Sequence, residues 1–283
     1  MEKTLSQPSI PNAISRSMSN AASFGSLIFR DVQFGYPTSD SQMLALPSVL
    51  ESISFKARPG EVTAITGPSG CGKSTLLNLT AGVLRPNQGS ITHENAEGIV
   101  KQVRCGYVFQ NPTLIPWRSV MSNAIYGCEL AGMNPAESEA AASVHLHALG
   151  LAEYRDSYPR KLSGGMQHRL AFVRMVVSGA PVLLLDEPFS NSDFKIRREL
   201  QKRLIEVVQT EQRVALLVSH DLEEMVRVAS QIVVLSQRPA RVLEIISLHD
   251  LQSRASGPMS HARTDLLPYV EQLEAAMLKA SND

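Results

Sequence analysis

The chain has 283 residues, of which 43% are hydrophobic and 19% are charged, so it has the composition of a globular protein with one large or two modest domains. This composition excludes a fibrous or wholly disordered chain. The 27 lysine and arginine residues balance the 27 aspartate and glutamate residues, so charge gives no argument for binding nucleic acid or an anionic membrane surface.

The first 26 residues are rich in serine, with asparagine and proline between, and lack the apolar core of a secretory signal. We therefore expect a disordered arm and no export. No apolar run approaches the roughly 20 residues that a membrane-spanning helix needs. The three cysteines, Cys71, Cys105 and Cys128, have no metal-ligand spacing, which favours free thiols in a reducing cytosol.

The opening of the chain is rich in expected strands. Residues 27–55 have the pattern of short strands around a loop rich in proline and serine at residues 37–48, and residues 61–66 form another short strand-like run. Helical patterns follow at residues 74–83 and at residues 134–150, where the second run ends in glycine.

After Pro181 expected strands alternate with helices. The strands are at residues 182–185, 214–218 and 232–235, and the helices at residues 198–209 and 222–229. This alternation predicts a parallel sheet covered by helices. Asp221 and Glu224 have the spacing of a capping box at the start of the second helix. Residues 266–280 have an apolar helical stripe, which predicts a last helix packed back on the body.

Residues 67–74 match the phosphate-loop pattern GxxxxGK[ST], directly after an expected strand and before an expected helix. Its glycines let successive backbone N–H groups point inward, and the helix start adds the positive end of its dipole. We expect Lys73 to reach the β and γ phosphates of a nucleotide and the Ser74 hydroxyl to bind magnesium. The alternative is a glycine-rich turn that binds nothing. The expected nucleotide contacts are Gly67, Pro68, Ser69, Gly70, Cys71, Gly72, Lys73, Ser74 and Thr75.

The apolar strand at residues 182–185 ends in Asp186 and Glu187. Ligands of open α/β sheets bind at this carboxyl edge. We expect Asp186 to hold magnesium through water, and Glu187 to polarise the water that attacks the γ phosphate. The alternative is an acidic strand exit before a turn at Pro188.

Residues 162–166 read Leu-Ser-Gly-Gly-Met before another expected helix, which forms a second anion site without a lysine. This segment resembles the signature of ATP-binding cassette (ABC) ATPases, where glutamine usually follows the glycines. The resemblance implies an α/β fold: a P-loop NTPase cassette with a parallel-sheet core, an N-terminal antiparallel β subdomain and a helical subdomain. It also implies a head-to-tail dimer in which Ser163, Gly164 and Gly165 contact the ATP bound by a second copy of the chain or by a homologous cassette.

Four further positions match the pattern of this family. Gln110 stands where the family has a glutamine near magnesium and the attacking water, and His220 where its switch histidine contacts the γ phosphate. Asp193 stands where a dimer-interface aspartate is found. Tyr36 resembles the aromatic residue that stacks on adenine, although a tyrosine packed within the sheet is an alternative. The resemblance thus implies Glu187, His220 and Gln110 as catalytic residues, and Ser74, Gln110 and Asp186 as magnesium ligands.

Two departures from the family pattern affect the dimer. The usual Ser-Ala-Leu-Asp is Ser-Asn-Ser-Asp at residues 190–193, which keeps Asp193 but loses the apolar packing of alanine and leucine. Met166 and His168 replace residues that are more often glutamine. We interpret these changes as tuning of the dimer, with activity retained.

Residues 114–120 and 238–241 are similar to importers of nitrate, taurine, aliphatic sulfonates and pyrimidine precursors. The resemblance implies an ATP-hydrolysing subunit on the cytoplasmic face of the cell membrane, bound to integral membrane permease subunits and served indirectly by an extracytoplasmic solute-binding protein. Trp117 is expected either at the seam with the membrane subunit or packed inside the helical subdomain. The implied division is an arm at residues 1–26, an ATPase domain at residues 27–250 with a helical subdomain at about residues 111–180, and a helical C-terminal extension at residues 251–283.

Two other functions remain as alternatives. A soluble cassette ATPase acting on ribosomes or DNA usually has duplicated cassettes or long coiled-coil insertions, and a P-loop metabolite kinase would not need Ser163 or His220. Two histidines, His145 and His147, are expected on different faces of one helix and not as a metal pair. The basic residues between positions 195 and 203 are expected to form a solvated face.

Overall fold

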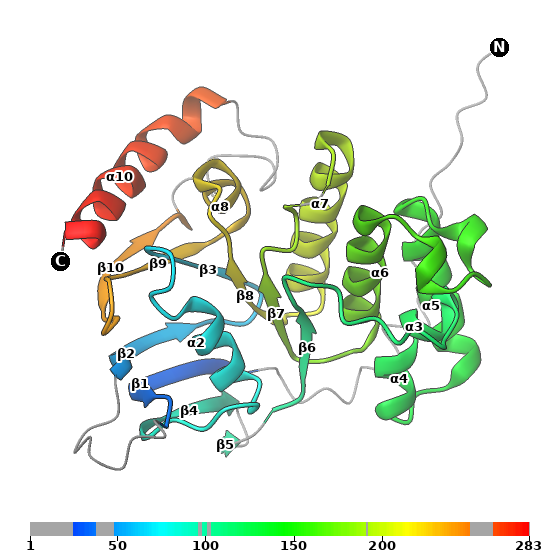
Figure 1. The fold of residues 1–283 in the computed structure, drawn as a ribbon, viewed down its shortest axis with the longest axis horizontal. Helices are drawn as coiled ribbons and strands as arrows, with labels where there is room; N and C mark the ends of the chain where they lie inside the picture. The colour runs from blue at the N-terminus through cyan, green and yellow to red at the C-terminus, as the bar shows by residue number, and fades with distance from the viewer. Residues whose placement is uncertain are drawn as a thin grey trace.

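The chain is described here by a computed structural model, which covers residues 25–37, 48–95, 98–100, 103–190, 192–249 and 263–282. Nearly all of the arm expected at residues 1–26 lies outside the described residues, as does the first part of the expected C-terminal extension. Two sheets form the body, with helices on both sides of the larger one (Figure 1).

The smaller sheet has the strand order β2-β1-β4-β5, and all of its pairings are antiparallel. Its strands are β1 (Ser26–Gly35), β2 (Ser48–Ala57), β4 (Gln88–Asn95) and β5 (Gly98–Val100). This is the antiparallel β subdomain that the sequence predicted. Its last two strands, β4 and β5, were not recognised in the sequence.

The larger sheet has the order β10-β9-β3-β8-β7-β6. Its strands are β3 (Val62–Thr66), β6 (Cys105–Val108), β7 (Val182–Asp186), β8 (Val214–Val218), β9 (Gln231–Leu235) and β10 (Val242–Ser247). The strands β9, β3, β8, β7 and β6 are parallel, and β10 adds an antiparallel edge that the sequence did not predict. Every residue of β3, β7, β8 and β9 is buried, because helices or the small sheet cover both faces.

Helix α2 (Lys73–Thr80) lies between the two sheets (Figure 1). Its Leu76 and Leu77 belong to one apolar core with Phe29 of β1 and with Leu184 and Leu216 of the larger sheet. This sandwich fixes the start of α2 directly at the end of β3, where the glycine-rich segment lies.

The other face of the larger sheet carries α6 (Gly164–Val177) and α7 (Phe194–Thr210), which share a second apolar core with α3 (Val120–Ala124) and α5 (Pro135–Ala148). The short helix α4 (Tyr126–Leu130) follows α3. Helices α3 to α6 fall within residues 111–180, the range expected for a helical subdomain, and its division from the rest stays a prediction.

The last helix, α10 (Arg263–Asn282), packs on α8 (Leu222–Val228) and on β9 and β10. Leu266 and Leu273 are buried and Val270 and Met277 are partly buried, which confirms the stripe seen in the sequence. None of the helices in the described part of the chain combines the length and apolar character that crossing a membrane requires. The three cysteines are free thiols, as expected.

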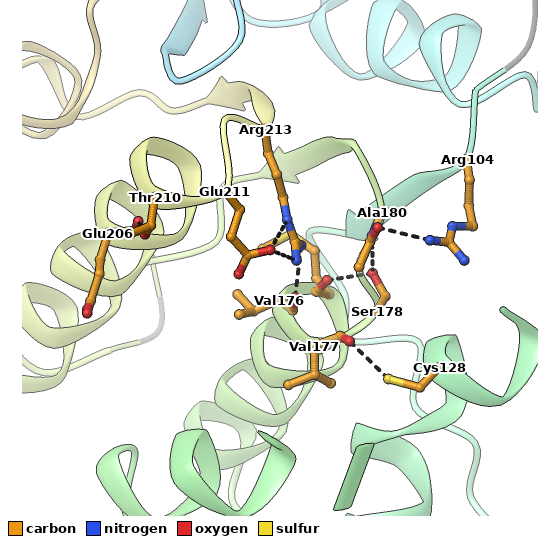
Figure 2. A network of polar contacts seen from close by, with 12 residues as sticks. Arg104, Cys128, Val176, Val177, Ser178, Ala180, Glu206, Thr210, Glu211 and Arg213 are labelled. Carbon is orange, nitrogen blue, oxygen red and sulfur yellow. Dashed lines mark hydrogen bonds and ion pairs between the residues drawn. The ribbon is translucent and has the colours of Figure 1, made fainter. Parts of the chain in front are cut away.

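Buried Arg213, just before β8, ties α6 to the end of α7 (Figure 2). Only 2% of its side chain is exposed, its Nε donates to Glu211 Oε2 at 2.9 Å, and one terminal nitrogen donates to the Val176 carbonyl at 2.9 Å. Nearby, the Cys128 thiol of α4 donates to the Val177 carbonyl at 2.9 Å. Three helices are therefore joined at one end of α6.

Two expectations about α7 and α8 are wrong in part. Helix α7 begins at Phe194, before the expected residue 198, because Asp193 caps it by accepting from the Ile196 N–H at 3.0 Å. Asp221 does cap α8, but the Glu224 side chain turns to other partners and does not complete a capping box.

The basic face expected between positions 195 and 203 is also wrong in part. The side chains of Arg197 and Arg203 are only 35% and 17% exposed, and they pair with Asp221 and Glu199. Arg203 also lies 3.5 Å from His145, whose pKa is lowered to about 4 by burial and by this neighbouring charge. These two arginines are therefore paired and only partly exposed, and do not belong to a fully solvated face.

Candidate functional site

The site lies at the carboxyl edge of the larger sheet, where consecutive strands deliver one segment each. In sheet order, residues 237–238 follow β9, the loop at residues 67–72 follows β3, His220 follows β8, Glu187 follows β7 and Gln110 follows β6. The parallel registers place Thr66 beside Val234 and Asp186 beside Val218, so these strand ends are level with each other. Segments far apart in sequence thus meet at one edge.

The loop between β3 and α2 needs glycine for steric reasons. Gly72 has φ 119°, and a Cβ there would lie 2.8 Å from Leu50 Cδ2. Gly67 has φ 154°, and a Cβ there would lie 2.7 Å from the Leu235 carbonyl oxygen. No other residue fits these two places without moving the packed strands.

Lys73 lies across this loop. Its Nζ donates to the Gly67 carbonyl at 2.7 Å and to the Pro68 carbonyl at 2.9 Å. The ammonium group is therefore held at the loop by neutral acceptors, which the charged oxygens of a phosphate can replace with stronger hydrogen bonds. Cys71 is buried in the same loop, and burial raises the pKa of its thiol.

Ser74, in the first turn of α2, and Asp186, at the end of β7, lie close together. The Ser74 hydroxyl is near enough to the Asp186 carboxylate, which is only 7% exposed, to lower its pKa. Burial raises the pKa of Asp186, and the Ser74 hydroxyl and the Lys73 charge oppose that shift. A carboxylate and a hydroxyl oxygen at one point are ligands of the kind that Mg²⁺ prefers, so the residues present fit this ion. The third expected ligand, Gln110, is exposed just beyond β6, the neighbour of β7.

Glu187 and His220 form the second pair at the edge. His220 Nδ1 lies 3.4 Å from Glu187 Oε1, and the imidazole is 72% exposed. Glu187 has φ 49°, a left-handed conformation that is costly for a residue with a side chain and recurs at functional sites. A carboxylate and a histidine therefore lie together at this edge, next to Asp186.

Tyr36 follows β1 and reaches the same helix as the loop. Its hydroxyl shares a hydrogen bond of 3.2 Å with the Thr75 hydroxyl, and its ring meets Phe34 edge-on with centroids 4.9 Å apart. Because 43% of Tyr36 is exposed, the alternative of a tyrosine packed within the sheet is wrong. Tyr36 is therefore partly exposed while its hydroxyl contacts α2.

Gln237 and Arg238 are site residues that sequence reasoning missed. With residues 68–71 of the loop they line an open cavity of about 440 Å³. In the sequence, Arg238 was noted only within residues 238–241, which are similar to a group of importers, and not as a site residue. Both residues lie next to the phosphate loop because β9 is the neighbour of β3 in the sheet. They could have been predicted only with knowledge of this strand order.

The signature segment makes no polar contact with the phosphate loop among the described residues, and neither does Asp193, although it lies in the loop that follows β7. Ser163 is exposed and caps α6 by accepting from the Met166 N–H at 3.3 Å, and a Cβ added at Gly164 would meet nothing within 4 Å. Within the described residues, no hydrogen bond or ion pair joins Ser163 or Asp193 to the phosphate loop. Both are open to the outside.

A parallel sheet with a glycine-rich anion loop after β3 and a buried carboxylate at the end of β7 defines a P-loop nucleotide-binding protein. A protein-family model described as ABC transporter matches residues 50–190. The taurine import ATP-binding protein TauB of Yersinia pestis is 39% identical over 208 residues, which are 74% of this chain and 82% of the relative. TauB of Pseudomonas entomophila is 35% identical over 231 residues, 82% of this chain and 89% of the relative.

Solved structures agree on the fold. The dimeric structure of the bacterial ABC transporter cassette MJ0796 superposes with a TM-score of 0.67 at 24% identity, covering 78% of this chain and 98% of that one. An ATP-binding subunit of another ABC transporter gives 0.68 at 23% identity, covering 87% and 99%. The chain belongs to the ATP-binding cassette (ABC) family. It is a transporter ATPase that binds ATP.

Proposed function

We propose that the chain is the ATP-hydrolysing subunit of an importer for a small solute, of the taurine, sulfonate or nitrate kind or a pyrimidine precursor. It acts as a head-to-tail dimer on the cytoplasmic face of the cell membrane, coupled to separate permease subunits and through them to an extracytoplasmic solute-binding protein. The observation that carries the proposal is the pair of Glu187 and His220, 3.4 Å apart, beside the linked Ser74 and Asp186. The 39% identity to TauB supports an importer of the sulfonate class.

The site acts through positioning and charge. Lys73 exchanges its two carbonyl partners for the β and γ phosphates of ATP, while the loop N–H groups bind the remaining phosphate oxygens. Ser74, Asp186 and Gln110 would hold Mg²⁺, which would neutralise negative charge on the phosphates. Glu187 orients and deprotonates the attacking water, and His220 contacts the γ phosphate from the next strand.

A second copy of the chain completes this site. Ser163, Gly164 and Gly165 present an open helix start with free N–H groups, which suits the far side of a bound triphosphate. Asp193 is also exposed, and Phe194, which is 73% exposed, supplies apolar surface that the altered interface loop otherwise lacks. Exposed aromatic residues of this kind are typical interface anchors.

The segment at residues 115–119 is built to display Trp117. Asn123 is fully buried, and its Oδ1 accepts from the Ile115 N–H at 2.8 Å. Its Nδ2, which has two protons to donate, lies 3.0 Å from each of the carbonyl oxygens of Ile115, Arg118 and Ser119. Trp117 itself is 78% exposed, so the alternative of packing inside the helical part is wrong. A rigid loop with an exposed tryptophan supports docking of a permease subunit here.

The variant Glu187→Gln tests the proposal. It keeps the shape of the site but removes the base, so it should bind ATP, form an ATP-dependent dimer and release almost no phosphate. Light scattering reports the dimer and a phosphate-release assay the turnover. Glu206→Gln, which removes an exposed carboxylate of α7, is the control and should behave as the parent protein. Normal hydrolysis by Glu187→Gln would reject the role given to Glu187.

A further inference from the structure

A set of polar contacts joins the two loops that carry Glu187, Asp193 and His220. We call it the loop bridge. It consists of Arg197 and Gln201 of α7, Ser219 and Asp221 of the loop after β8, and Glu224 of α8.

Arg197 spans the two loops. One terminal nitrogen lies 3.5 Å from Asp221 Oδ2, and the other donates to the Ser192 carbonyl at 3.4 Å, next to Asp193. Its third nitrogen, Nε, is buried and has no hydrogen-bond partner among the described residues. A planar guanidinium can make two such contacts in a fixed relative geometry, which an ammonium group cannot. The position of Ser192 is therefore linked to that of Asp221.

Glu224 holds the other side of the His220 loop. Its carboxylate accepts from the Ser219 hydroxyl at 2.6 Å and from the Gln201 amide at 3.0 Å, and only 7% of the residue is exposed. The Ser219 hydroxyl in turn accepts from the Asp221 N–H at 3.1 Å. Burial raises the pKa of Glu224 while the two hydrogen bonds oppose that shift. A buried carboxylate with two donors is costly to displace, so it anchors the loop.

His220 lies between these two anchored residues. Its backbone is fixed through Ser219 on one side and Asp221 on the other, while its imidazole remains 72% exposed and 3.4 Å from Glu187. A cavity of about 80 Å³ separates the catalytic pair from the bridge, and its lining includes Glu187 and His220 together with Arg197 and Glu224. The loop bridge and the pair of Glu187 and His220 thus line the same cavity.

We propose that Arg197 and Glu224 are positioning residues that set the place of His220 relative to Glu187 according to the place of the Asp193 loop. The proposal rests on the function above, in which a second copy of the chain contacts Asp193. A shift of Ser192 on dimer formation moves Arg197, and Arg197 moves Asp221 and the histidine beside it. Small errors in the placement of a catalytic group are expensive, so the bridge converts dimer contact into turnover.

The test is a cycle of variants in Arg197 and His220. Arg197→Met should lower the kcat for ATP hydrolysis about tenfold and leave the KM for ATP within about twofold, because the phosphate loop is untouched. In the His220→Ala background, Arg197→Met should lower the residual rate by less than about twofold, since a residue that acts through His220 has nothing left to position. Lys202→Met removes an exposed charge from the same helix and is the matched control.

A merely structural role gives a different pattern. Equal losses in both backgrounds, or an unchanged kcat in Arg197→Met, overturn the proposal. Glu224→Gln is the second variant, since it keeps the shape of the side chain but not its charge, and it should lower kcat in the parent protein and not in His220→Ala. A loss that persists without His220, or no loss at all, overturns the role of Glu224.

The failure of this inference differs from the failure of the proposed function. ATP-dependent dimer formation is measured separately, in Glu187→Gln with and without Arg197→Met. If neither Glu187→Gln nor its Arg197→Met derivative forms a dimer with ATP, the proposed head-to-tail assembly is wrong. The kcat values of the Arg197 and His220 variants still decide whether Arg197 acts through His220.

Discussion

Replacement of Arg213 by methionine should destabilise the protein strongly, although the residue lies outside the site. Its guanidinium group has only 2% exposure and binds both Glu211, at the end of α7, and the Val176 carbonyl, near the end of α6 (Figure 2). Methionine fills a similar volume but leaves the Glu211 carboxylate without its partner and the Val176 carbonyl without a donor.

The expected magnitude follows from this geometry. Removal of one partner of a buried ion pair costs about 3 to 5 kcal/mol. The Glu211 side chain remains 25% exposed and can recover some hydration, so we expect the lower end, about 3 kcal/mol. For a protein of this size, 1 kcal/mol changes Tm by roughly 2 to 4 °C, so the expected decrease is about 9 °C.

Scanning calorimetry measures this change. Arg155→Met is the matched control, because its ion pair with Glu139 is 45% exposed on both sides and should contribute at most about 1 kcal/mol. The double variant Arg213→Met with Glu211→Leu should recover most of the lost stability, since it leaves no buried charge. The reasoning is refuted if Arg213→Met lowers Tm no more than Arg155→Met, or if the double variant is as unstable as the single one.

Two further changes test the phosphate loop and the last helix. Lys73→Ala should weaken ATP binding about 100-fold, because it removes the charged donor from the loop. Titration with a fluorescent ATP analogue measures the Kd, and an unchanged Kd would contradict this prediction. Leu273→Ala should cost about 2 to 5 kcal/mol of unfolding free energy, because this side chain of α10 is fully buried against the body of the protein, while Leu278→Ala, at 69% exposure, should cost less than about 0.5 kcal/mol. Denaturant unfolding of the two leucine variants measures the difference, and equal losses would show that α10 does not pack as described.

The local parts of this protein could be predicted from its sequence alone. The loop at residues 67–74 was predictable because glycine conformations, a helix start and a lysine at fixed spacing act within a few residues. The strands at residues 182–185 and 214–218 were predictable because strands buried on both faces need unbroken apolar runs. Asp186 and Glu187 followed from the end of one such strand.

What the sequence could not supply depends on which segments become neighbours. The partner of Glu224 in α7 is Gln201, 23 residues away, and the partner of Tyr36 is Thr75, 39 residues away. Arg197 and the exposed Lys202 lie on the same helix, and Arg197 is partly buried because the start of α8 places Asp221 within reach. The spacing of apolar residues in a sequence indicates which face of a helix or strand is buried. The pairing of charged groups depends instead on strand order and register, which only tertiary packing determines.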